Sequence, residues 1–166
     1  MNDKQAKRGL GYYLKYFFSH FEEIMLFIIL SVLVTLAFVN VITRYFIKYS
    51  LAFTEEIEVN FFVWLTMLGA ALAFKKKAHL GVSFFVNLFP PKTRKFFLIL
   101  STVLTVGVFS VLFYYSIWHV KNEIELDVRT MALNIPEWIY IMGVPFGSII
   151  IIIRVIESAI KTYKEI

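Results

Sequence analysis

The feature that most constrains this chain is a set of four long apolar runs. They span residues 24–42, 57–74, 96–118 and 136–156. A helix needs about 20 mostly apolar residues to cross the hydrocarbon core of a bilayer, and each run has about that length. The charged residues within these limits, Glu58, Glu137 and Arg154, lie near the ends of the runs. The pattern predicts an all-α integral membrane protein with four transmembrane helices.

Composition supports this fold class. Hydrophobic residues make up 59% of the 166 residues and charged residues only 17%, against about 45–50% and about 25% in average soluble domains. A soluble chain of this size could not bury so much apolar surface. The absence of Cys excludes disulfides, Cys-ligated metals and thiol catalysis. We expect one membrane domain over residues 1–166. We expect no cleaved signal peptide, because the first apolar run is long and no small-residue cleavage site follows it.

The distribution of basic residues predicts the orientation of the spans. Thirteen of the 17 Lys and Arg residues lie in the N-terminal segment, the second loop and the C-terminal end. Four lie in the first and third loops. Cytoplasmic loops of membrane proteins carry an excess of Lys and Arg. Both termini and the second loop are therefore predicted to be cytoplasmic.

Local signals predict where helices begin and bend. Thr54 is expected to cap the second spanning helix, with Glu55 and Glu56 in a first turn where the helix dipole favours anions. Asn134 is expected to cap the fourth. Pro145 should kink that helix or free a backbone carbonyl.

Two further segments are expected to lie along the membrane surface. Residues 10–22 carry apolar side chains at helical spacing and predict an interfacial amphipathic helix. Residues 80–89 have an apolar face but are too short to span, and Pro90 follows them. Either segment could instead pack on a partner subunit.

The spans lack the residues that ion-coupled transport usually needs. No ionisable residue lies in the middle of a run, whereas proton relays and ion pathways usually place such residues there. The chain alone is thus a poor candidate for a pump or channel. His20, His79 and His119 are expected at the membrane boundaries, which does not favour a haem site. We assign no catalytic, substrate-binding or metal-binding residue and do not expect an enzyme.

Small residues mark candidate packing surfaces. Gly69 and Ala73 form one small-xxx-small pair, and Gly143 and Gly147 form another. Two interpretations remain open for these pairs, namely packing among the chain's own helices and docking of a second membrane protein.

The membrane boundary that is predicted to lie on the extracytoplasmic side carries charged and aromatic candidates. Arg44 could pair with Glu55 or Glu56, or these charges could simply be hydrated. Trp138 and other boundary aromatics, Trp118 and Tyr140, are expected to anchor the helices at the interface. The acidic segment 121–134 is predicted to be a loop that could contact a partner.

Taken in order, several motifs resemble the small permease subunit, DctQ type, of tripartite ATP-independent periplasmic (TRAP) transporters. The similarity runs through Val41–Tyr45, Leu51–Glu56, Trp64, Leu68–Ala71, Lys75–Val82 with His79, Asn87–Pro90, Ile135–Trp138 and Pro145–Gly147. Phe53 stands where the family typically has Trp, and Ser83 stands where an acidic residue often follows the histidine. Any role of that carboxylate is therefore in doubt in this chain.

The resemblance implies a sodium-coupled, binding-protein-dependent importer of organic acids such as sialic acid or C4-dicarboxylates. This chain would be the static scaffold for a large elevator-type subunit in the bacterial cytoplasmic (inner) membrane. Its implied partners are that large permease subunit, an extracytoplasmic substrate-binding protein and membrane lipids, with no nucleic acid. No cofactor is expected in this subunit, and sodium would bind the large one. The alternative is a membrane anchor subunit of a redox complex, which would need cofactor ligands at depth.

Overall fold

The computed structural model describes residues 10–48, 51–76 and 90–165, which are mainly helical. The elements are α1 (Leu10–Ile42), the π-helix η1 (Thr43–Ile47), α2 (Ala52–Lys75), α4 (Pro91–Glu125), α5 (Trp138–Ile141) and α6 (Gly143–Glu165). Among the described residues, four helices are long and apolar enough to cross a membrane: His20–Ile47, Ala52–Lys75, Pro91–Glu125 and Trp138–Lys164. The expectation of an all-α protein with four spans is confirmed at this level.

The helices extend beyond the apolar runs. The run 96–118 lies within α4, which begins at Pro91 and continues to Glu125. Residues 121–125 of the predicted acidic loop therefore form the last turns of a helix. Likewise residues 10–22 are the first turns of α1, so the backbone shows one continuous helix there. The predicted surface segment 80–89 lies outside the described residues.

Two predicted caps are wrong. The residue that precedes α2 is Leu51, and the buried hydroxyl of Thr54 donates to the Leu51 carbonyl at 2.6 Å. It therefore does not accept a hydrogen bond from an amide of the first turn, as a capping oxygen would. Asn134 adopts a left-handed conformation with φ of 55°, several residues before the fourth span starts at Trp138.

The fourth span is broken near its start, as Pro145 predicts. Its helix is interrupted at Met142, between α5 and α6. A proline has no N–H to donate to the carbonyl four residues earlier, and its ring crowds that carbonyl. For Pro145 this carbonyl belongs to Ile141, the last residue of α5. The interruption is therefore a direct consequence of the proline.

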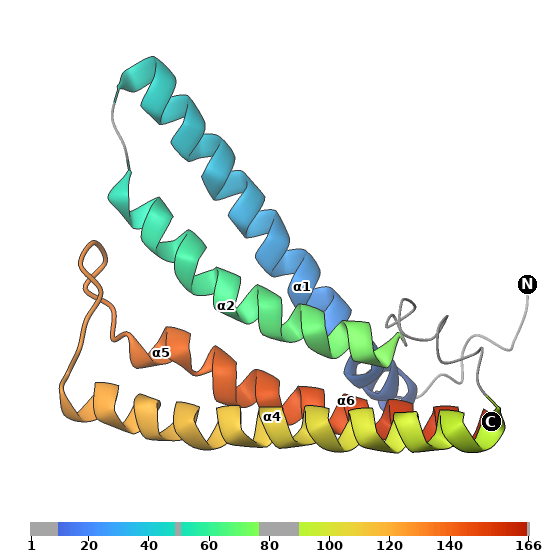
Figure 1. Cartoon of the computed structure of the whole chain (residues 1–166). Helices are drawn as coiled ribbons and strands as arrows, with labels where there is room; N and C mark the ends of the chain where they lie inside the picture. Colours follow the sequence, from blue (N-terminus) through green and yellow to red (C-terminus); the bar gives the residue numbers. More distant parts are fainter. Residues whose placement is uncertain (1–9, 49–50, 77–89, 166) are drawn as a thin grey trace, which may run out of the picture.

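The spans form a row rather than a closed bundle. α6 contacts α2 on one side and α4 on the other, and α1 packs on α2. Figure 1 shows α1 and α2 converging at one end and separating toward the loop that joins them. The buried residues of α1 that pack on α2, Ile29 and Leu33, lie near the middle of α1. Beyond them, large side chains including Phe38, Tyr45 and Phe46 are exposed.

The antiparallel spans have two chemically different ends. The start of α4 and the end of α6 lie together at one end (Figure 1), near the end of α2. The basic side chains described at this end are Lys75, Lys76, Lys92, Arg94, Lys95, Arg154, Lys161 and Lys164. The opposite end has Arg44, Lys48, Lys121 and Arg129. We refer to the first as the basic end.

Candidate functional site

A buried carboxylate joins three helices at the basic end. Glu22 of α1 is only 2% exposed, and its Oε2 lies 3.2 Å from Nζ of Lys75 at the end of α2. Its Oε1 accepts a hydrogen bond from Nε of Arg154 in α6 and forms an ion pair with Nη2 of the same guanidinium. The three side chains, called here the Glu22 cluster, thus connect helices that are distant in sequence.

Further charges surround the Glu22 cluster. Arg154 also donates to Oε2 of Glu157 at 2.7 Å, and Glu23 lies 3.4 Å from Nζ of Lys76. Arg154 and Lys75 keep 18% and 20% of their side-chain surface exposed. A buried ion is costly unless it is paired and hydrogen-bonded. Glu22 meets both conditions, so the cluster fixes how α1, α2 and α6 meet.

The sequence reasoning missed this site. Glu22 lies within the segment predicted to be an interfacial helix, and nothing local distinguishes it from a hydrated carboxylate. Its partners lie 53 and 132 residues further along the chain. A signal was nevertheless present, because Glu22, Lys75 and Arg154 all fall at the same predicted membrane boundary. An acid and two bases at equal depth on different spans are candidates for an interhelical pair.

The glycines of the fourth span pack within the chain. A Cβ built on Gly143 would lie 3.0 Å from the indole of Trp64, and one built on Gly147 would lie 2.4 Å from Cβ of Met67. Both glycines are buried. Trp64 also packs on Phe146, with ring centroids 6.0 Å apart. Of the two interpretations left open by sequence, intrachain packing describes this pair, because α2 and α6 approach closely there.

Gly69 differs from these glycines. A Cβ at this position would meet no atom within 4 Å, although Gly69 and Ala73 are both half-buried. No contact within the described chain therefore requires glycine here. The docking interpretation stays a prediction for this part of α2.

At the opposite end, Glu56 binds the loop that precedes α5. Its Oε2 accepts a hydrogen bond from the backbone N–H of Ala132 at 2.7 Å. The loop is closed by an isolated antiparallel bridge between Arg129 and Pro136. Arg44 is exposed within η1. The loop thus supplies the partner of Glu56, and an ion pair of Arg44 with Glu55 stays a prediction.

The remaining sequence candidates have varied environments. Tyr140 was expected at the membrane interface but is buried, and its ring packs edge-on against Phe61 with centroids 6.4 Å apart. The half-buried Trp138 begins α5, and Pro145 is buried in α6. His79 lies outside the described residues. The described part of the chain contains no group of three His, Cys, Asp or Glu side chains that could hold a metal ion.

These features define a class of protein before any comparison. Four helices suited to a membrane, three of them joined by an ion cluster at one end, indicate a multi-pass helical membrane protein. The sequence profile of the DctQ component of tripartite ATP-independent periplasmic transporters matches residues 33–165. The chain therefore belongs to this family of TRAP small permease subunits, and the expectation from resemblance is confirmed. With four apolar helices, family membership indicates a multi-pass protein of the bacterial inner membrane.

Individual relatives agree with this assignment. A Haemophilus influenzae protein named for the small permease of a TRAP transporter is 40% identical over 78 residues, which are 47% of this chain and 48% of that protein. The chain thus matches about half the length of this relative. The ectoine TRAP transporter small permease protein TeaB of Halomonas elongata is 29% identical over 143 residues, covering 86% of this chain and 74% of TeaB. The sialic acid TRAP transporter permease protein SiaT of Haemophilus influenzae is 25% identical over 127 residues, covering 75% of this chain but 20% of SiaT.

Proposed function

We propose that this chain is the static small membrane subunit of a sodium-coupled, binding-protein-dependent importer of organic acids. The observation that carries the proposal is family membership in a chain whose apolar runs carry charged residues only near their ends. An ion-coupled transport site usually needs polar or ionisable groups at depth. Here the Glu22 cluster instead ties α1, α2 and α6 together at the basic end. Substrate and sodium would accordingly bind a second subunit.

That second subunit is proposed to be a large TRAP permease. The chain matches only a fifth of SiaT, so most of that permease has no counterpart in this chain. Two exposed apolar surfaces are available for such a partner. One is the part of α1 beyond Leu33, and the other is the outer side of α4, in which few residues are buried. Gly69 of α2 adds a place of close approach.

The basic end is proposed to face the cytoplasm, as the excess of Lys and Arg there predicts. The opposite end, with the loop held by Glu56, would then face the extracytoplasmic binding protein. The substrate class is proposed as organic acids, including sialic acid and C4-dicarboxylates. Relatives named for ectoine and for sialic acid match similar shares of this chain. The small subunit is therefore a poor guide to the substrate.

Reconstitution tests the proposal. The chain and a large TRAP permease from the same organism are placed in proteoliposomes with a TRAP substrate-binding protein of that organism, and uptake of labelled organic acids is measured. We expect uptake only when both membrane proteins, the binding protein and an inward sodium gradient are present. Full uptake without this chain, or without sodium, would contradict the proposal. Family membership favours this role over a redox anchor, for which the purified chain would show visible cofactor absorption.

A cross-link tests whether the subunit is static. The chain has no native Cys, so paired cysteines can be introduced without background. Leu33 of α1 and Leu68 of α2 belong to one buried cluster, and the double variant Leu33→Cys/Leu68→Cys would be joined by oxidation. We expect uptake after oxidation to equal uptake after reduction. Loss of uptake that is reversed by reductant would mean that α1 and α2 move during transport.

A further inference from the structure

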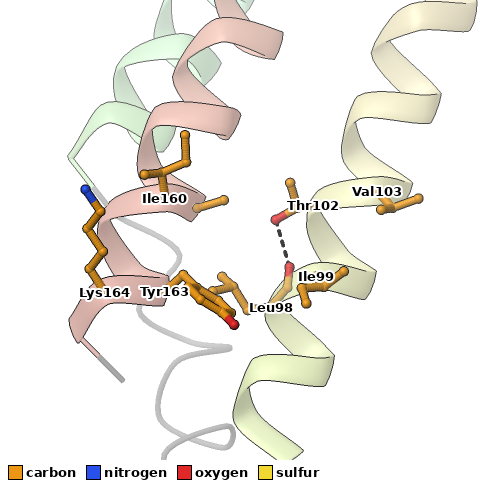
Figure 2. Close-up of a pocket in the computed structure, with 8 residues that line it drawn as sticks. Leu98, Ile99, Thr102, Val103, Ile160, Tyr163 and Lys164 are labelled. Carbon is orange, nitrogen blue, oxygen red and sulfur yellow. Dashed lines mark hydrogen bonds between the residues drawn. The ribbon is translucent and has the colours of Figure 1, made fainter. Parts of the chain in front are cut away.

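A groove of about 270 Å³ lies between α4 and α6 toward the basic end. Figure 2 shows its lining side chains, which come from the first turns of α4 and the last turns of α6. They are Leu98, Ile99, Thr102, Val103, Ala159, Ile160, Tyr163 and Lys164.

The floor of the groove suits hydrocarbon. Thr102 carries a hydroxyl there, and this group donates to the carbonyl of Leu98 at 2.7 Å, so its hydrogen bond is satisfied within α4. Ile99, Val103 and Ile160 are each more than half exposed. The groove is therefore open on the side that faces the bilayer, and an alkyl chain could enter without leaving a polar group unpaired.

The mouth of the groove is basic. Lys164 is one of the lining residues, and its side chain lies on the side of α6 away from α4 (Figure 2). Nζ of Lys95 lies 4.6 Å from the ring centroid of Tyr163, another lining residue. Val103 lies eight residues beyond Lys95 on α4, or roughly 12 Å at 1.5 Å per residue. Cations therefore stand at one end of the groove, and the apolar lining continues from them toward the middle of the span. A phospholipid has this same order of charge and hydrocarbon.

We propose that the groove binds an acyl chain of an anionic phospholipid whose phosphate contacts Lys95 and Lys164. The charge of the mouth selects the occupant. Basic pockets between membrane helices bind anionic head groups, whereas an apolar side chain from a neighbouring helix would itself offer neither ammonium group a counter-charge. Lipid binding in this groove does not require transport activity, so this proposal can fail while the proposed function holds, and the reverse is also true.

Lipid binding to the purified full-length chain tests the charge selection. Phosphatidylglycerol and phosphatidylcholine with the same acyl chains are titrated in detergent, and bound lipid is counted by native mass spectrometry. Each lysine near an anionic surface contributes about a fivefold gain in affinity, so two give a preference of roughly thirtyfold for phosphatidylglycerol. Lys95→Gln/Lys164→Gln should remove the preference, and the control Lys121→Gln at the opposite end should keep it. Equal binding of the two lipids by the unaltered chain would overturn the proposal.

A second pair of variants tests the groove itself. Thr102→Trp, at a lining position whose side chain points toward α6 (Figure 2), fills the groove and should weaken binding of both lipids. Val111→Trp adds the same ring to an exposed position of α4 outside the groove and should not. Circular dichroism of both variants verifies that the helices form. Equal binding by the two variants would exclude the groove as the site.

The occupant in the membrane is identified by photocross-linking. A photoreactive amino acid replaces Ile160 in the chain co-expressed with its large permease, and the adduct is identified by mass. An adduct with a phospholipid supports the proposal. An adduct with the large permease, with a second copy or with another segment of this chain would show that protein covers the groove, and would overturn it.

Discussion

Glu22→Gln is the most informative single change, because it keeps the shape of the side chain and removes its charge. In the native chain this carboxylate is 2% exposed and receives Lys75 at 3.2 Å together with Arg154. Removing one partner of a buried pair costs about 3–5 kcal/mol. Arg154 would keep Glu157 at 2.7 Å, and both cations retain some contact with solvent. We therefore expect the lower value, about 3 kcal/mol.

The assay is thermal unfolding of the purified chain in detergent, followed by tryptophan fluorescence. Trp64 lies against α6 at Gly143 and so reports on packing between α2 and α6. At roughly 2–4 °C per kcal/mol for a chain of this size, the Tm should fall by roughly 6–12 °C. The matched control is Glu157→Gln. Its side chain is 46% exposed and pairs with Arg154, so its loss should cost less than about 1 kcal/mol.

A double-mutant cycle separates pairing from a general effect of substitution. Glu22→Gln and Arg154→Gln each remove one member of the Glu22–Arg154 pair, whereas the double variant removes both members. The free energy of unfolding lost in the double variant should therefore be smaller than the sum of the losses in the two single variants by more than about 1 kcal/mol. Additive losses, or a Tm for Glu22→Gln no lower than that of Glu157→Gln, would refute the idea that this cluster holds the helices together.

The other predictions concern close approaches between elements. Gly147→Ala should lower the free energy of unfolding by about 1–3 kcal/mol through overpacking, because the added Cβ would lie 2.4 Å from a side chain of α2. The control Gly107→Ala adds a Cβ in open space, so equal Tm values for the two variants would contradict this prediction. Gly69→Leu should leave the Tm of the isolated chain unchanged but reduce co-purification with the large permease, and an undiminished yield of complex would remove Gly69 from the interface. Glu56→Gln should weaken the charged acceptor of the Ala132 amide and speed its hydrogen exchange, and an unchanged rate would show that the loop does not depend on the carboxylate.

The spans were predictable because lipid makes local sequence decisive. A backbone in the bilayer core must satisfy its hydrogen bonds internally, so an apolar run of sufficient length has few alternatives to a helix. Helix ends were less predictable because they lie where water is again available. α4 accordingly continues through polar residues to Glu125. The capping signal at Thr54 failed because its hydroxyl donates to Leu51 instead of accepting.

The site was less predictable than the fold because it depends on which helices are neighbours. The pairs Gly143–Gly147 and Gly69–Ala73 look alike in sequence, yet a Cβ added at Gly143 or Gly147 meets α2 closely, whereas one added at Gly69 meets no atom within 4 Å. That difference follows from the row in which α6 stands between α2 and α4. Spacing within one helix carries no information about this order.

The same row explains why the Glu22 cluster matters most for α1. α6 packs on both α2 and α4, whereas α1 packs mainly on α2, around Ile29 and Leu33, and reaches α6 through the pair of Glu22 with Arg154. In a bilayer, apolar contacts between helices replace equally apolar contacts with lipid and give little net attraction. Charges hidden between helices have no comparable alternative in lipid. The position of α1 therefore depends more on Glu22 than on its apolar packing, so the loss of this carboxylate should loosen α1 before it disturbs the contact of α6 with α4.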